Sequence, residues 1–161
     1  MNTDSATILS ILDEVKDPEI PLLSVVDMGI VRGVREEDAD LVVTITPTYS
    51  GCPAMKMIED DITAALRKRG YASARVEVVL DPPWTTDWLT DRGRERLKES
   101  GIAPPGERTD ELVLFPSRQA LECPHCGSKD TRLESEFGST ACKALWACNA
   151  CGQPFDYFKP L

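Results

Sequence analysis

The stretch "LVVTITPTYSGCPAMKMI" (residues 41–58) joins a strand pattern directly to a helix pattern. Up to Thr46 an apolar face alternates with a mixed one, which predicts a strand. "TYSG" predicts a turn, Pro53 suits the first position of a helix, and Gly70 supplies the stop. We therefore expect a strand, a tight turn and a helix in succession, with Cys52 at the junction.

The flanking sequence adds two strands to this pattern. "GIVRGVREEDAD" (residues 29–40) ends in a short acidic turn, so we expect it to form a hairpin with the strand that follows. "RVEVVLDPP" (residues 75–83) predicts a third strand with Val76, Val78 and Leu80 on one face, closed by two prolines.

Helices are expected on either side of these strands. Apolar residues from Ile8 to Val15 follow the helical spacing i, i+3, i+4, i+7, and Asp17 before a proline ends the pattern. "TTDWLTDRGRERLKESG" (residues 85–101) predicts a single third helix. The order helix, strand, strand, helix, strand, helix describes an α+β domain over residues 1–101.

The rest of the chain divides into a linker and a small second domain. Residues 102–120 contain three prolines and no periodicity, which indicates a linker, and the "ELVLF" segment within it (residues 111–115) is a candidate short strand. Residues 121–161 hold the remaining cysteine motifs and are expected to form a β-rich domain.

Composition and charge limit the possible functions. The 161 residues are 42% hydrophobic and 28% charged, which is typical of a soluble globular protein. The apolar runs are far shorter than the roughly 20 residues of a membrane span, and the N-terminus lacks a signal-peptide pattern, so we expect a cytoplasmic protein without membrane contact. The net charge is −9, with 14 basic and 22 acidic residues in 1–120 and 4 and 5 in 121–161, so we expect no nucleic-acid partner.

The most specific motif is a pair of C-x-x-C knuckles, each followed by glycine. "CPHCGS" carries Cys123 and Cys126, and "CNACGQ" carries Cys148 and Cys151 after 21 intervening residues. This spacing is close to that of four-cysteine zinc sites, and four thiolates leave no open position for a substrate. We therefore predict a zinc ribbon with a structural metal. Iron suits the same four sulfurs and remains an alternative.

Other residues of the ribbon have less specific roles. His125 lies within the first knuckle and is expected to be an exposed non-ligand. Cys142 is expected to be a small buried residue or a contact residue. The aromatic side chains near the end of the chain are expected to form the core of the ribbon, with a docking face as the alternative. These aromatic residues are Trp146, Phe155, Tyr157 and Phe158.

The single histidine also limits catalysis. Because His125 lies between knuckle cysteines, no free imidazole is left for a Ser-His-Asp or Cys-His nucleophile. A di-iron site built from Glu-x-x-His pairs is likewise excluded within this chain. We therefore predict a protein that is not itself an enzyme.

The position of Cys52 suggests a reactive thiol. With Pro53 as the first helical residue, Cys52 would be the N-cap, where unpaired backbone amides and the helix dipole stabilise a thiolate. Such a sulfur can bind iron or an iron–sulfur cluster, or carry a persulfide. The alternative is that the tight turn requires a small residue. Asp17, Glu19 and Asp27 are candidates for the same site, although each also suits a cap or turn.

Three motifs together resemble the iron–sulfur cluster assembly domain family. They are "DPEIPLLSVVDMGIV", "TPTYSGCPAM" and "LDPPWTTDWLT". The ribbon, with "SEFGSTACKALWAC" and "PFDYFK", resembles the tail of one branch of that family, the D (or J) subunits of the phenylacetyl-CoA epoxidase system of aerobic phenylacetate degradation. The resemblance extends from about residue 6 to residue 159.

The resemblance implies a function for these residues. It implies that Cys52 is the functional thiol, that Asp17, Glu19 and the pair Thr46 and Pro47 border it, and that the knuckle cysteines bind a metal. It also implies participation in ring epoxidation, with oxygen chemistry on a separate di-iron subunit and electrons from a reductase subunit.

The leading hypothesis is an accessory protein that helps mature the iron–sulfur or iron centre of the epoxidase, with Cys52 as a transient ligand. A structural subunit that holds oxygenase and reductase together is the alternative. The expected partners are the other epoxidase subunits, and the sequence leaves a homodimer open.

Overall fold

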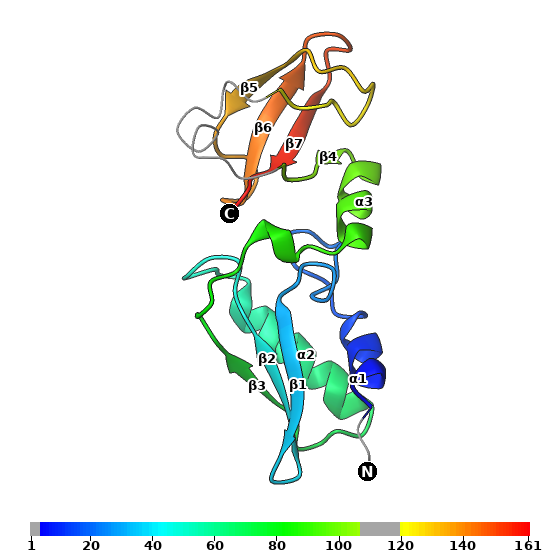
Figure 1. Ribbon diagram of the computed structural model, residues 1–161, viewed down its shortest axis with the longest axis vertical. Helices are drawn as coiled ribbons and strands as arrows, with labels where there is room; N and C mark the ends of the chain where they lie inside the picture. The colour runs from blue at the N-terminus through cyan, green and yellow to red at the C-terminus, as the bar shows by residue number, and fades with distance from the viewer. Residues whose placement is uncertain (1–3, 107–119) are drawn as a thin grey trace. The chain divides into compact units, whose positions relative to one another are not determined.

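The computed structural model describes residues 4–106 and 120–161. The chain forms two compact units, Met1–Gly93 and Arg94–Leu161, with the border inside the third α-helix (Figure 1). The first unit contains α1 (Ser5–Leu12), β1 (Val31–Glu37), β2 (Asp40–Ile45), α2 (Met55–Lys68), β3 (Arg75–Val78), the 3-10 helix η1 (Thr86–Trp88) and the start of α3 (Asp91–Glu99). The second unit contains the rest of α3, β4 (Ile102–Ala103), β5 (Thr131–Ser135), β6 (Lys143–Cys148) and β7 (Pro154–Phe158).

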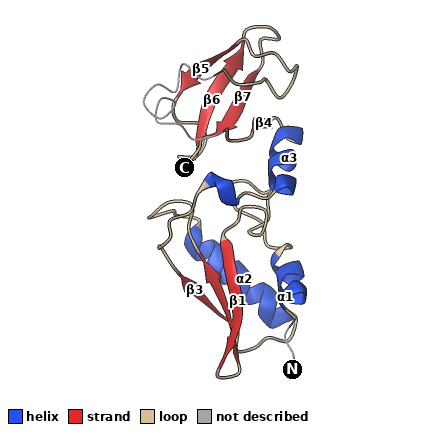
Figure 2. Ribbon diagram, in the orientation of Figure 1, coloured by secondary structure: helices blue, strands red, loops and turns tan. Residues whose placement is uncertain are grey.

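The sheet of the first unit has the order β1-β2-β3 (Figure 2). β1 and β2 form the predicted antiparallel hairpin, and its turn places Asp38 and Ala39 at φ values of 51° and 72°. Two consecutive residues with positive φ are typical of the tight turns whose twist matches that of the strands. β3 runs parallel to β2, and α2 makes the crossover between them.

The core of the first unit lies between this sheet and its helices. α1 contacts β1 and α2, and α2 also contacts β3. α2 buries an apolar stripe at Ile58, Ile62 and Leu66, and Val43 and Ile45 of β2 are also fully buried. The sequence-based prediction of an α+β fold is therefore confirmed.

The prediction of one continuous third helix over residues 85–101 is wrong, because this stretch forms η1 and α3. Thr85 caps η1 by accepting a hydrogen bond from the Asp87 amide, and the chain then extends at Leu89 (φ −58°, ψ 131°). Thr90 caps α3 in the same way, because its Oγ1 accepts from the Gly93 amide at 3.0 Å. Two capping threonines thus divide the stretch into two helices.

The first helix is shorter than its apolar pattern. α1 ends at Leu12, although Val15 beyond it is also buried. The Val15 amide donates to Leu12 and its carbonyl accepts from Val25, so Val15 packs from a turn that returns toward the sheet. A buried residue at helical spacing is therefore not sufficient to extend the helix.

The second unit contains a sheet with the order β4-β7-β6-β5, in which β5, β6 and β7 are antiparallel and β4 is parallel to β7. Residues 102–103 of the predicted linker form β4, whereas the predicted "ELVLF" strand lies outside the described residues. In the described parts of both units, no helix has the length and apolarity that a membrane span requires.

Candidate functional site

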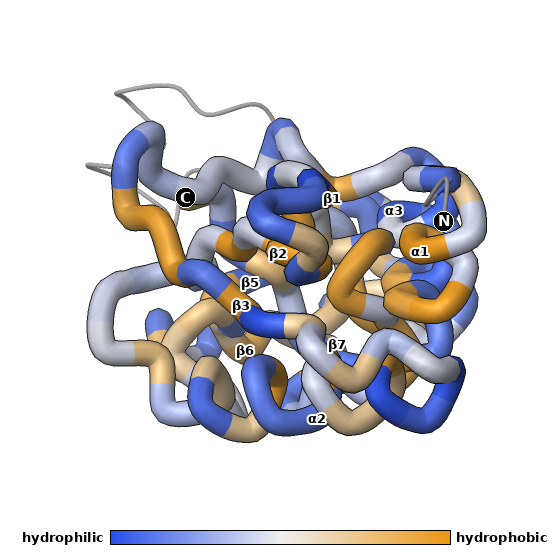
Figure 3. Tube along the Cα trace, turned by 90° about the horizontal axis from the view of Figure 1, so that it is seen from below, coloured by the Kyte–Doolittle hydropathy of each residue, from blue (hydrophilic) through white to orange (hydrophobic). Residues whose placement is uncertain are grey.

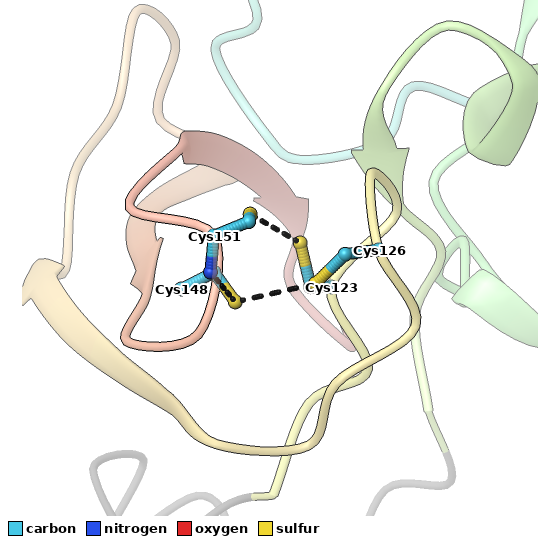
Figure 4. Close-up of side chains that lie close together, drawn as sticks. All are labelled: Cys123, Cys126, Cys148 and Cys151. Atoms are coloured by element: carbon cyan, nitrogen blue, oxygen red, sulfur yellow. Dashed lines mark hydrogen bonds between the residues drawn. The ribbon is translucent and has the colours of Figure 1, made fainter.

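The four knuckle cysteines converge in the second unit (Figure 4). Cys123 and Cys126 lie in the loop that leads to β5, Cys148 ends β6, and Cys151 lies in the turn before β7. All four Sγ atoms lie within 4.8 Å of one another. The shortest separations cross between knuckles: 3.8 Å from Cys123 to Cys151 and 3.6 Å from Cys126 to Cys148.

This spacing fits a tetrahedral metal site. Four Zn–S bonds of about 2.3 Å at tetrahedral angles place the sulfurs about 3.8 Å apart. Each knuckle also turns back through a glycine, since the amides of Gly127 and Gly152 donate to the carbonyls of Cys123 and Cys148 at 2.8 and 2.9 Å. Both glycines have positive φ, 78° and 74°, which other residues adopt with strain.

Backbone amides donate to two of the four sulfurs, and at Cys148 this favours the thiolate form that a metal needs. The amide of Cys151 donates to Cys148 Sγ at 3.5 Å, and this hydrogen bond lowers the pKa of Cys148 to about 7. The amide of His125 donates to Cys123 Sγ at 3.4 Å. Residues that bind metal through sulfur must first lose the proton, and Cys148 is the thiol that this hydrogen bond prepares. The pKa values of Cys126 and Cys151 are instead raised, because their thiols share hydrogen bonds with neighbouring thiols and are partly desolvated.

The neighbouring ribbon residues take the predicted positions. His125 is exposed and its ring lies against Gly101 instead of joining the sulfur cluster. Cys142 is buried, with Sγ 3.1 Å from the Thr140 hydroxyl. The aromatic prediction is also confirmed: Trp146, Phe155 and Tyr157 are buried in one cluster with Cys123 and Cys148, and Phe158 is fully buried.

Cys52 lies in the loop between β2 and α2, and its side chain is half-buried. The predicted N-cap role is wrong, because α2 begins at Met55 with Ala54 as its N-cap. Two successive turns cause the delay: the Cys52 amide donates to Tyr49 and its carbonyl accepts from Met55. The first helical hydrogen bond, from Ile58 to Ala54, comes only afterwards.

The start of α2, just after the Cys52 loop, has features that favour a bound anion. Ala54 supplies no side-chain cap to α2, and the first turn of the helix has no acidic residue. Thr46 and Pro47 lie at the end of β2, where the Cys52 loop starts. The Thr46 hydroxyl is buried and has no hydrogen-bond partner among the residues that the structure describes. Such a group is uncommon and marks a place where a further polar partner fits.

Asp17 and Glu19 occupy a turn in the segment between α1 and β1. Asp17 is buried, and its Oδ1 accepts from the amides of Glu19 and Ile20 at 2.8 and 2.9 Å. These two hydrogen bonds stabilise the turn, which is the alternative role that the sequence already allowed for Asp17. That Asp17 and Glu19 belong to the same site as Cys52 stays a prediction.

Asp27 takes part in an ion network that sequence analysis missed. Its carboxylate is fully buried and accepts from Arg92 Nε at 2.6 Å, while the Arg92 guanidinium also pairs with Asp13. Hydrogen bonds to Asp13 and Asp27 raise the pKa of Arg92. Asp27 thereby ties the start of α3 to the loop before β1. No sequence signal connects positions 65 residues apart.

Comparisons with known proteins match both units. A family model described as "Iron-sulfur cluster assembly protein" matches residues 5–78, and one described as "PaaD zinc beta ribbon domain" matches residues 107–159. The chain is 47% identical over 152 residues to a protein of Escherichia coli (strain K12) that is named as the D subunit of a putative 1,2-phenylacetyl-CoA epoxidase. The likeness covers 94% of this chain and 90% of that protein.

Two further relatives resemble a part of the chain. It is 35% identical over 85 residues to the Fe-S protein maturation auxiliary factor YitW of Bacillus subtilis (strain 168), which covers 52% of this chain and 82% of that protein. A solved structure of a conserved hypothetical protein from Thermotoga maritima aligns with a TM-score of 0.50 and 31% identity, across 59% of this chain and 94% of that one. The chain therefore belongs to the family of phenylacetyl-CoA epoxidase D subunits, and it combines an iron–sulfur cluster assembly domain with a PaaD-type zinc ribbon.

Proposed function

We propose that this protein is an accessory component of a phenylacetyl-CoA epoxidase system that helps to install an iron–sulfur or iron centre in another subunit. Cys52 acts as the transient ligand of the metal, and no turnover by the protein itself is required. The observation that carries the proposal is the combination of two likenesses in one chain. Nearly the whole chain resembles an epoxidase D subunit, and the first unit resembles proteins named as Fe-S maturation factors.

The surroundings of Cys52 support its role as a ligand. A ligand that accepts and releases iron must be reachable, and the Cys52 side chain is half-buried in a loop instead of enclosed in the core. Backbone amides at the start of a helix favour negative charge, and α2 begins three residues later without a side-chain cap. The Thr46 hydroxyl at the end of β2, for which the described part of the chain supplies no hydrogen-bond partner, offers one further polar contact.

The ribbon takes a structural part in this proposal. Four thiolates fill the coordination sphere of its zinc, so the metal has no open position for chemistry. The ribbon then serves to recognise the other epoxidase subunits, with the reductase and the di-iron oxygenase as the expected partners. Metal delivery is left to the first unit.

A scaffold subunit is the second candidate, and the name of the E. coli relative favours it because that protein is described as a subunit. A scaffold would bind oxygenase and reductase together and would need no thiol at position 52. The two candidates therefore differ in whether Cys52 is required.

The test is to co-express the epoxidase components with Cys52→Ser and to purify them without oxygen. Ser50→Ala, in the same loop, is the matched control. We expect the reductase made with Cys52→Ser to contain less iron and sulfide and to have less activity, and the control to equal the wild type. A reductase with a full cluster content would rule out the thiol role. Stoichiometric co-purification with the oxygenase would then favour the scaffold.

A further inference from the structure

Trp84 holds a distant turn of the first unit through its indole. The side chain of Trp84 is buried, and its Nε1 donates to the carbonyl of Met28 at 2.8 Å. Met28 lies in the turns between α1 and β1, where residues 20–30 are mostly apolar and are seen in orange near these two labels (Figure 3). A phenylalanine would fill much of the same space but could not donate a hydrogen bond. The indole N–H therefore fixes the place of the Met28 carbonyl.

The same turns hold the end of β2. The carbonyl of Ile30, two residues after Met28, accepts from the amide of Thr46 at 2.9 Å. Pro47 follows and has no amide hydrogen, so the strand end cannot continue this pairing at the next residue. The position at which the chain leaves the sheet therefore depends on Ile30, and through it on Met28.

The hydrogen bonds of Cys52 itself determine a different property of its loop. The Cys52 amide donates to Tyr49 and the Cys52 carbonyl accepts from Met55, so both bonds stay between the end of β2 and the start of α2. They fix the local shape of the loop, but they do not connect the loop to the turns before β1. The bond between Ile30 and Thr46 makes that connection at the first end of the loop.

We infer that Trp84 is a positioning residue for Cys52, an inference that rests on the ligand role proposed for this thiol. Trp84 holds Met28, the turn after Met28 holds Thr46, and Thr46 sets where the loop that carries Cys52 begins. Trp84 thus acts through these residues and not by contact with a metal. A ligand whose supporting residues are fixed binds metal more effectively than the same ligand in a loose loop.

Amide hydrogen exchange, followed by NMR, tests the path from Trp84 to Thr46. Trp84→Phe keeps an aromatic ring and removes the donor. We expect the Thr46 amide to exchange at least about threefold faster, because loss of one buried hydrogen bond favours local opening to that extent. The Val79 amide donates to Ile45 from the other side of β2 at 2.9 Å, and it should keep its rate. An unchanged Thr46 rate would overturn the inference.

A second variant separates positioning from a general loss of stability. Ile62→Val removes one methylene from the fully buried face of α2, outside both the turns and the loop. Urea denaturation checks that this control is at least as destabilised as Trp84→Phe, and Ile62→Ala replaces it if it is not. We expect the control to leave the ratio of the Thr46 and Val79 exchange rates unchanged. The same change of the ratio in both variants would mean that Trp84 acts only through stability, which would also overturn the inference.

Alkylation reports on Cys52 itself. The full chain, kept in zinc-containing buffer, reacts with iodoacetamide, and mass spectrometry measures how fast the peptide that contains Cys52 is modified. Trp84→Phe should raise this rate at least about threefold, since the loop then opens more often, and Ile62→Val should leave it unchanged. Equal rates for the wild type and Trp84→Phe would count against any positioning of Cys52 by Trp84.

The cluster content of the reductase separates this inference from the proposed function. When the epoxidase components are co-expressed with Trp84→Phe, we expect the reductase to contain less iron and sulfide than with the wild type, but more than with Cys52→Ser. A full cluster content with Cys52→Ser would refute the ligand role, while exchange and alkylation would still decide whether Trp84 positions the loop. A low content with Cys52→Ser and a full content with Trp84→Phe would leave the ligand role intact and refute the inference.

Discussion

The first unit buries long aliphatic side chains between a three-stranded sheet and two helices, whereas the second unit has four clustered sulfurs beside a small aromatic core. In the first unit α1 and α2 contribute Ile8, Leu12, Ile62 and Leu66, all fully buried. In the second, Cys123 and Cys148 are themselves part of the core. One unit is therefore stabilised mainly by apolar burial, whereas we expect the other to depend on a metal held by its four clustered cysteines.

The difference follows from size and composition. Burial of apolar surface grows with the length of a domain, and the ribbon part of the second unit (residues 121–161) has only about 40 residues, a length at which domains usually need a metal or disulfides to fold. A structural zinc bound by the four cysteines would supply the missing stability. This comparison predicts that the two units respond differently to the same treatment.

Metal removal should have the largest effect, and on the second unit alone. A strong chelator is expected to unfold the ribbon, because structural zinc contributes roughly 10 kcal/mol or more in small zinc domains. Amide NMR spectra of the full chain should then lose the dispersed signals of residues 120–161 and keep those of the first unit. Cys126→Ser should act like the chelator, whereas Cys142→Ser, which changes a cysteine outside the cluster, should keep the ribbon folded. An unchanged ribbon spectrum after metal removal would contradict the comparison.

Gly29→Ala should have a large effect on the first unit only. Gly29 has φ +66°, and a Cβ there would lie 2.2 Å from the backbone oxygen of Trp88. The backbone cannot move aside easily, so we expect a loss of about 3 kcal/mol in the free energy of unfolding. Gly33→Ala is the control, since a Cβ there meets nothing within 4 Å. Urea denaturation of both variants measures the difference. Equal stabilities would show that the loop before β1 adapts to a side chain.

The sequence predicts the parts of each unit that depend on local patterns. Alternation of side chains gives strands in the first unit, and helical spacing gives the buried stripe of α1 that begins at Ile8. The knuckle spacing predicts the sulfur cluster, because the chemistry of one metal determines which residues meet.

Other features depend on contacts that form only in the folded chain. The break at Leu89 requires the threonine caps on both sides of it, and the late start of α2 requires the turns around Cys52. Arg92 reaches Asp27 from a distant part of the sequence, so no local pattern reveals the pair. Exposure of Val78 is also not predictable, because an apolar strand face is normally covered.

Arg92→Met should have an intermediate effect, because it leaves the Asp27 carboxylate buried without its cation. We expect a loss of about 2 kcal/mol, less than for a fully enclosed pair, because the Arg92 side chain is 47% exposed. The double variant Asp27→Asn, Arg92→Met should lose less than the sum of the two single variants, since the buried charge is then gone. Additive losses in urea denaturation would show that the two side chains act independently.

Lys56→Met should have the smallest effect, although it also removes an ion pair from the first unit. Lys56 and Asp60 are 2.8 Å apart on α2, but their side chains are 76% and 64% exposed. Water screens such a pair, and the ordering of two long side chains offsets the remaining attraction. We therefore expect a urea midpoint equal to that of the wild type within error, while Arg92→Met shifts it clearly. Lys56 pairs with one exposed carboxylate, whereas Arg92 pairs with the buried Asp27 and also with Asp13. A comparable shift for Lys56→Met would therefore mean that neither the burial of a partner carboxylate nor the second ion pair determines the cost.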